Sequence, residues 1–281
     1  MSPLVGAEEL AARLGEPGLA VLEVALEPSD AAFREAHVPG SRWAWWKALL
    51  WHETDRRFPD PETLAARLGA LGVGGSDTLV LVGDPIQFAT YAFWVLHMLG
   101  RRDVLLLDGG RARWLAGGFP VESGEPQPVA AALHPAGEAD FSASVGRDGV
   151  LESLGGERVI LDFRTREEYA GERVSPASAP IDHGAERKGR IPGARHLYYE
   201  RLLADDGTFR TRDELGAVFA EAGVLPDDDV IAYCRLSHRA SLGWFALTRL
   251  LGRDRVRVYD GSWTEWGSIV GMPIESESTV R

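Results

Sequence analysis

The chain of 281 residues contains an internal repeat, and this repeat constrains the fold more than any other feature. Short apolar and glycine-containing segments of the first half return in the second half in the same order. The matching segments are 37–40 with 190–193, 64–73 with 215–224, 78–84 with 229–234, and 104–110 with 256–262. A single long-period repeat of this kind predicts two duplicated domains.

The length of the chain agrees with this interpretation, because 281 residues are enough for two domains of ordinary size. Between the halves, residues 122–139 are rich in Pro, Gly, Ala and Glu and lack apolar periodicity, which is typical of a linker. We therefore predict a first domain over 1–123, a linker over 124–140 and a second domain over 141–281.

Each half alternates short apolar runs with helical patterns. The strands predicted are 19–24, 79–82 and 104–107 in the first half, and 159–162, 230–233 and 256–259 in the second. The helices predicted are 62–71, 212–222 and 240–251. Strands that alternate with helices predict an α/β fold, in which each domain has a mainly parallel sheet covered by helices on both faces.

The charge of the chain restricts its partners. A formal net charge of -12 argues against nucleic acid as a partner, since binding to phosphates rests on Lys and Arg. The sequence contains no apolar run long enough to span a membrane, and its N-terminus lacks a basic segment followed by an apolar core. We expect no membrane partner and a cytoplasmic location.

Cys234 is the only cysteine, so neither an intramolecular disulfide nor a cysteine-rich metal site can form. It ends the apolar run 230–233 and precedes a helical pattern, which places it at the carboxyl end of a strand. Ligands bind at this end of open parallel sheets. In the short loop 234–239, successive backbone N–H groups can converge on one point at a helix N-terminus, which favours an anion and a thiolate.

Three residues of this loop, Arg235, His238 and Arg239, can carry positive charge. Positive charge beside a cysteine stabilises both the thiolate and an anionic substrate. The alternative is that these side chains are solvated surface groups, and for His238 the two interpretations are about equally supported.

The loop CRLSHRAS at 234–241 and the segment YDGSWTEW at 259–266 resemble the second domain of tandem-domain rhodaneses, the thiosulfate sulfurtransferases. The segments LDGGRARW at 107–114 and HVPG at 37–40 resemble their first domain. The resemblance extends over nearly the whole chain, and the motifs are specific in combination.

The resemblance implies a sulfurtransferase that takes the outer sulfur of thiosulfate as a persulfide on Cys234, releases sulfite, and passes the sulfur to cyanide or a thiol. The implied donor-binding residues are Arg235, Leu236, Ser237, His238 and Arg239. Their backbone amides would hold the sulfur, and the two arginines would balance the donor's charge. Neither a metal nor an organic cofactor is implied. The partners expected are an anionic sulfur donor and a thiophilic acceptor, which can be a protein.

Asp84 occupies the position in the first half that Cys234 occupies in the second. A carboxylate cannot form a persulfide, so the first domain is predicted to be catalytically silent.

Three positions depart from the family pattern or need a separate interpretation. Ser237 stands where the family usually has Gly. Because a side chain disfavours the positive φ that Gly adopts freely, we expect the loop to be slightly reshaped. Glu168 stands where some thiosulfate sulfurtransferases place a substrate-binding Arg, so that role is not transferred. Arg164 matches a family arginine, for which a structural salt bridge is the favoured role.

Three other functions remain open from the sequence. A 3-mercaptopyruvate sulfurtransferase has the same fold and cysteine, but commonly a small residue after it, whereas Arg235 favours compact thiosulfate. Related phosphatases and arsenate reductases place five residues between Cys and Arg, whereas four separate Cys234 from Arg239. A relay that passes persulfide to a protein partner would carry the same motifs.

Overall fold

A computed structural model describes residues 2–179 and 181–277. The chain divides into two compact units, which are described separately below. Unit 1 comprises Met1–Phe141 together with Asp205–Phe209, and unit 2 comprises Ser142–Ala204 and Arg210–Arg281. The predicted domain boundaries at residues 123 and 141 stay predictions.

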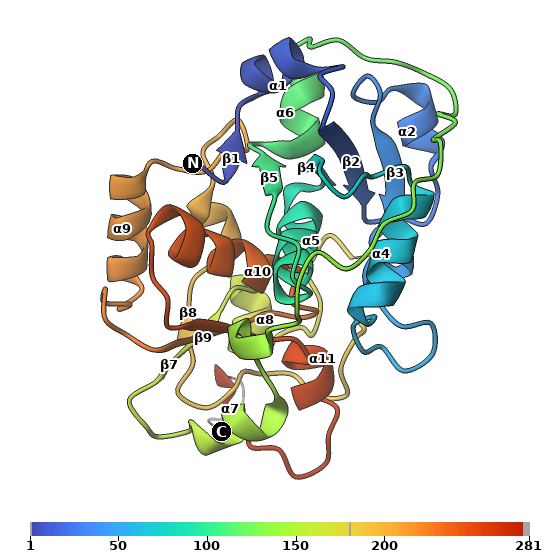
Figure 1. Cartoon of the computed structure of the whole chain (residues 1–281). Coiled ribbons are helices and arrows are strands. Elements are labelled where there is room, and N and C mark those ends of the chain that lie inside the picture. Colours follow the sequence, from blue (N-terminus) through green and yellow to red (C-terminus); the bar gives the residue numbers. More distant parts are fainter. Residues whose placement is uncertain (1, 180, 278–281) are drawn as a thin grey trace. The chain divides into compact units, whose positions relative to one another are not determined.

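Unit 1 is built on a five-stranded parallel sheet in the order β1-β5-β4-β2-β3 (Figure 1). Its strands are β1 (Leu4–Val5), β2 (Leu19–Ala25), β3 (Arg42–Trp45), β4 (Thr78–Asp84) and β5 (Val104–Leu107). Its helices are α1 (Ala7–Arg13), α2 (Ala31–Glu35), α3 (Trp46–Leu50), α4 (Pro61–Ala70), α5 (Ile86–Met98) and α6 (Gly110–Ala116). Helices thus connect successive parallel strands, as parallel pairing requires.

Unit 2 repeats this architecture with a sheet in the order β6-β10-β9-β7-β8, again parallel throughout. Its strands are β6 (Ser144–Val145), β7 (Val159–Asp162), β8 (Arg195–His196), β9 (Val230–Tyr233) and β10 (Val256–Tyr259). Its α-helices are α7 (Arg147–Glu152), α8 (Arg166–Ala170), α9 (Arg212–Glu221), α10 (His238–Phe245) and α11 (Ser262–Trp266). The 3₁₀ turns η1 (Phe141–Ala143) and η2 (Tyr199–Leu202) and the π-helical turn η3 (Ala246–Leu250) complete the elements.

The two sheets have the same strand order when the strands of each unit are numbered from its own start. An isolated antiparallel bridge also recurs, between His37 and Glu122 in unit 1 and between Arg190 and Glu275 in unit 2. The predicted α/β fold with two duplicated domains is therefore confirmed.

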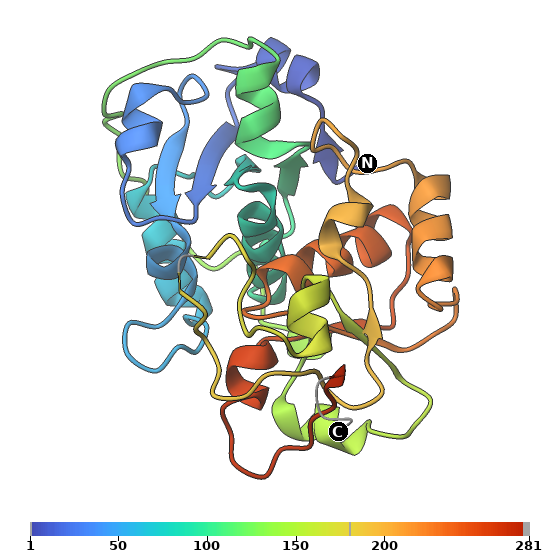
Figure 2. The same cartoon turned by 180° about the vertical axis from the view of Figure 1, so that it is seen from behind.

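Alternate residues of each central strand pack on opposite faces of the sheet. In unit 1, Val80 and Val82 join a buried cluster with Leu10 of α1 and Trp114 of α6, while α5 packs on β2, β4 and β5. In unit 2, Tyr233 belongs to a buried cluster with residues of α7 and α11, while α10 packs on β9 and β10. Figure 2 shows the same elements from behind, where η2 lies beside α9 and α10. Each sheet is therefore buried between helices.

Residues 205–209 follow unit 2 elements in the chain but pack within unit 1. The amide of Phe209 donates to Asp108 Oδ1 at 2.8 Å, and Arg113 lies 3.4 Å from Asp206 Oδ2. Burial raises the pKa of Asp108, and the bond from Phe209 opposes this rise.

Within the described residues, no helix is both long and apolar enough to cross a membrane.

Candidate active site

Cys234 is the first residue after strand β9, and only 1% of it is exposed. Its amide donates to Ser262 Oγ at 3.2 Å, and its carbonyl accepts from the amide of Trp263 at 2.9 Å. Ser262 Oγ in turn donates to the carbonyl of Tyr259 at the end of β10. The backbone of the cysteine is therefore fixed to the turn that follows the neighbouring strand.

Four residues, Cys234 to Ser237, separate strand β9 from helix α10. In the part of the chain that the structure describes, the amides of Arg235, Leu236 and Ser237 donate no hydrogen bond to a protein acceptor. Such N–H groups ahead of a helix N-terminus can bind an anion. The loop therefore has the donors that a sulfur anion on Cys234 would need.

Ser237 adopts a φ of 72°, in the left-handed region that favours glycine. Its hydroxyl donates to the carbonyl of Asp260 at 2.6 Å and lies 3.4 Å from Ser262 Oγ. This hydrogen bond offsets part of the conformational cost, so serine takes the backbone conformation that the family's glycine takes easily.

Arg235 is partly buried, and its Nη1 donates to the carbonyl of His183 at 2.9 Å. Within residues 2–179 and 181–277, no carboxylate lies within 4.0 Å of its guanidinium. Burial, and then the charge of Arg239, lowers the pKa of Arg235, while Glu168 and Cys234 act in the opposite direction. Arg235 therefore brings an unbalanced positive charge to the loop.

Arg239 differs from Arg235, because both of its terminal nitrogens contact Glu168, at 2.7 and 2.9 Å. Burial alone would lower the pKa of Arg239, but the hydrogen bonds and charge of Glu168 raise it above its ordinary value. Its partner comes from helix α8, and sequence reasoning did not identify it.

A second buried ion pair lies next to the end of strand β9, where Asp162 of β7 is the register partner of Tyr233. Arg164 and Asp162 are both 0% exposed, and Arg164 Nη2 lies 2.6 Å from Asp162 Oδ2. The hydroxyl of Tyr233, the residue before Cys234, donates to the same carboxylate at 2.6 Å. Burial would raise the pKa of Asp162, but Arg164 and these hydrogen bonds lower it. The structural salt bridge predicted for Arg164 is therefore confirmed.

The remaining predicted residues, Leu236 and His238, also belong to this loop and to the start of α10. Leu236 is partly buried, and His238 is 7% exposed with its carbonyl accepting from Ser241 Oγ at 2.7 Å. Tyr199 of η2 is a neighbour that the sequence did not suggest. Burial raises the pKa of Tyr199 to about 12, with contributions from Glu200 and a smaller one from the charge of Cys234. Tyr199 is therefore a neutral phenol within electrostatic range of the thiol.

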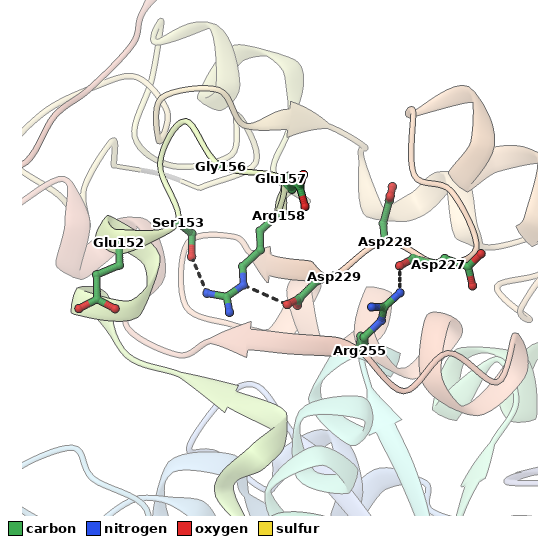
Figure 3. Close-up of a pocket in the computed structure, with 9 residues that line it drawn as sticks. All are labelled: Glu152, Ser153, Gly156, Glu157, Arg158, Asp227, Asp228, Asp229 and Arg255. Atoms are coloured by element: carbon green, nitrogen blue, oxygen red, sulfur yellow. Dashed lines mark hydrogen bonds and ion pairs between the residues drawn. The ribbon is translucent and has the colours of Figure 1, made fainter.

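Unit 2 has a hollow at the amino-terminal ends of strands β7, β9 and β10 (Figure 3). There Arg158 donates to Asp229 at 3.0 Å and to Ser153 at 3.1 Å, and Arg255 donates to the carbonyl of Asp227. The arginines in this hollow thus bond to neighbouring protein groups, and Cys234 lies at the other end of β9.

No group of three or more His, Cys, Asp or Glu side chains that could hold a metal ion occurs in the described residues.

The fold and this site define a class: an α/β protein with two duplicated domains, whose second domain has a buried cysteine at the start of a short loop between a strand and a helix. The model of the rhodanese-like domain matches the chain twice, over residues 6–117 and 147–269. The chain belongs to the rhodanese family.

Relatives match nearly the full chain. A protein of Saccharopolyspora erythraea named "Putative thiosulfate sulfurtransferase" is 39% identical over 274 residues, covering 97% of this chain and 96% of the relative. The "Sulfur carrier protein TtuD" of Thermus thermophilus is 36% identical over 281 residues, covering 96% and 95%. Among solved structures, an anaerobic ergothioneine biosynthesis enzyme from Chlorobium limicola is 25% identical with a TM-score of 0.81, covering 98% of this chain and 70% of that one.

Proposed function

We propose that the protein is a sulfurtransferase in which the Cys234 thiolate takes the outer sulfur of thiosulfate. The thiolate attacks that sulfur, a new S–S bond forms on Cys234, the S–S bond of thiosulfate breaks, and its electron pair leaves with sulfite. The observation that carries this proposal is the single buried cysteine at the base of a loop with three amides that lack acceptors and one unbalanced arginine.

In the second half-reaction, cyanide or a thiolate attacks the outer sulfur of the persulfide. The new bond forms on the acceptor, the persulfide bond breaks, and Cys234 returns to a thiolate. Charge therefore develops on the same outer sulfur in both half-reactions, and fixed N–H groups aimed at it would lower both barriers.

The loop residues have separate roles in this proposal. The amides of Arg235, Leu236 and Ser237 form the cradle for the persulfide sulfur, and the guanidinium of Arg235 attracts the anionic donor. Arg239 contributes to the field at the thiolate, although Glu168 balances its charge. Unit 1 carries no sulfur, because Asp84 takes the place of the cysteine.

Two alternatives use the same cysteine. In the first, 3-mercaptopyruvate is the donor, and the product is pyruvate in place of sulfite. In the second, the persulfide passes to a protein acceptor, an idea that the similarity to a protein named as a sulfur carrier supports. The cytoplasmic location and the absence of nucleic-acid and membrane partners stay predictions from the sequence.

Intact mass spectrometry of the purified protein before and after thiosulfate tests the proposal. We expect a gain of one sulfur atom that cyanide removes as thiocyanate, and no gain in Cys234→Ser. A gain only with mercaptopyruvate would replace the donor, and a gain with neither donor would overturn the proposal. Phosphatase activity that disappears in Cys234→Ser would also contradict it.

A further inference from the structure

A buried carboxylate controls one of the two arginines of the Cys234 loop. Glu168 is 0% exposed and Arg239 is 11% exposed at their side chains, and the two terminal nitrogens of Arg239 contact the two oxygens of Glu168. A two-bond contact of this kind fixes the plane of the guanidinium and balances its charge. Arg239 is therefore not available to bind a donor anion with a full charge.

Glu168 is itself held in place by the start of helix α8. Its Oε2 accepts from the amide of Thr165 at 3.1 Å, and its own amide donates to Thr165 Oγ1 at 3.4 Å, which together form a capping box. Both carboxylate oxygens are thus occupied, and the ion pair has little freedom to open when a donor arrives.

Arg235 has no such partner. Its guanidinium donates to the carbonyl of His183, which fixes its position but leaves its charge unbalanced. The loop contains two arginines, yet Arg235, Arg239 and Glu168 together carry one net positive charge.

We propose that Glu168 is a specificity-determining residue, which keeps the donor site at one net positive charge by neutralising Arg239. It acts through Arg239 and does not touch the donor. Thiosulfate carries two negative charges. Its electrostatic binding advantage over a singly charged donor is therefore smaller at this site than it would be at a site with two unbalanced arginines. This inference rests on the proposed sulfur transfer and concerns the class of donor: singly charged sulfane compounds should compete well with thiosulfate.

Two donors that differ mainly in charge test the inference. Methanethiosulfonate has the outer sulfur of thiosulfate, but a methyl group replaces one anionic oxygen. Both donors give the same persulfide on Cys234, and the leaving groups are methanesulfinate and sulfite. The ratio of kcat/KM for thiosulfate to kcat/KM for methanethiosulfonate, with cyanide as acceptor, reports the charge that the site offers.

The variant Glu168→Gln keeps the size of the side chain and an oxygen for the amide of Thr165, but removes the charge. We expect the ratio to rise roughly three- to tenfold and the rise to shrink as salt is added. The matched control is Glu167→Gln, which removes the same charge from an exposed neighbour on helix α8 and should leave the ratio unchanged. The double variant Glu168→Gln/Arg239→Gln should return the ratio to the wild-type value.

An unchanged or lower ratio in Glu168→Gln, or an equal rise in Glu167→Gln, would overturn the inference, since a merely structural role would slow both donors alike. If Glu168→Gln does not fold, Arg235→Gln tests the same inference by lowering the net charge of the site instead of raising it. The site would then have no net charge, and we expect the preference for thiosulfate over methanethiosulfonate to fall at least threefold. A preference that stays the same would contradict the proposal.

Alkylation separates failure of this inference from failure of the proposed function. Iodoacetate and iodoacetamide react with the same thiol, but only iodoacetate is charged, and Cys234 is the only cysteine. Glu168→Gln should raise the rate with iodoacetate relative to iodoacetamide about threefold or more, whether or not any donor loads sulfur. If the ratio of these two rates does not change, Glu168 does not set the charge of the site.

Discussion

The carboxyl ends of strands β4 and β9 are equivalent places in two units of the same fold, yet the connection that follows each strand differs in length. In unit 1 a single residue, Pro85, separates Asp84 from helix α5, and a side chain at Gly83 would come within 2.6 Å of Ile86. In unit 2 three residues, Arg235 to Ser237, separate the equivalent Cys234 from helix α10. We therefore expect sulfur uptake to depend on the length of this loop as well as on the cysteine.

The largest effect is expected when the thiol is moved from the carboxyl end of β9 in unit 2 to the carboxyl end of β4 in unit 1. Cys234→Ser should abolish sulfur uptake, and Asp84→Cys in that background should not restore it, because Pro85 leaves no loop whose amides can surround the sulfur. We expect uptake at least about 10³-fold slower than in the wild type. The measurement is intact mass spectrometry after thiosulfate, with Cys234→Ser as the control.

Uptake by the Asp84→Cys variant within about tenfold of the wild-type rate would break the comparison. It would mean that the identity of one residue, and not the loop, distinguishes the two units.

The buried ion pair of unit 2, Asp162 with Arg164, should contribute more to the free energy of unfolding than the pair of unit 1, Glu23 with Arg111. Asp162→Asn leaves Arg164 without a counter-charge in a fully buried place, which should cost about 3–5 kcal/mol of unfolding free energy. Glu23→Gln in unit 1 should cost less, about 1–2 kcal/mol, because Arg111 also donates to the carbonyls of Ala32 and Ala36.

Urea unfolding of the full chain, followed for each variant and the wild type, measures both costs. Equal losses would show that the two pairs are equivalent in spite of their different surroundings.

The same two carboxylates should give stability opposite dependences on pH. The pKa of Asp162 is lowered by Arg164 against the effect of burial, so its contribution is present above about pH 4 and is lost as the pH falls through the lowered value. Burial raises the pKa of Glu23, so its contribution is present below about pH 4 and is lost as the pH rises through the raised value.

Each slope is at most about 1.4 kcal/mol per pH unit. The difference in unfolding free energy between the wild type and Asp162→Asn should rise with pH, and the difference between the wild type and Glu23→Gln should fall. Slopes of the same sign would contradict the assignment.

The smallest effect is expected at Ser237, which has no counterpart in the short connection of unit 1. Ser237→Ala keeps the cost of a positive φ and loses the hydrogen bond to Asp260, for a loss of about 1 kcal/mol. Ser237→Gly loses the bond but removes the backbone cost, so it should remain within about 0.5 kcal/mol of the wild type. Thermal unfolding compares the two, and a glycine variant less stable than the alanine variant would be the contrary result.

The central strands could be predicted from the sequence because they are apolar runs bounded by turn residues. The predicted ranges 104–107, 159–162, 230–233 and 256–259 match β5, β7, β9 and β10. The outer strands β1, β3, β6 and β8 were not predicted, because two to four residues paired on one side only leave no apolar run to recognise.

The candidate site could be predicted as far as its residues are contiguous in the sequence. The loop from Cys234 to Arg239 follows from a strand, a cysteine and a helix in order. The pairing of Arg239 with Glu168 joins residues 71 positions apart, and no local pattern indicates it. The left-handed conformation of Ser237 was not predicted either. The hydrogen bond that offsets its conformational cost goes to Asp260, which follows strand β10 and is distant in the sequence.

The short segment Asp205–Phe209 makes the duplicated halves inseparable as parts. Its residues are encoded within the second half, but they cap Asp108 and pair with Arg113 in unit 1. A protein that ends at the linker would lack these bonds in unit 1, and a protein that begins there would carry residues 205–209 without their partners. Recombination between relatives at that point would combine residues 205–209 of one protein with Asp108 and Arg113 of another, so we expect the two halves to be inherited together.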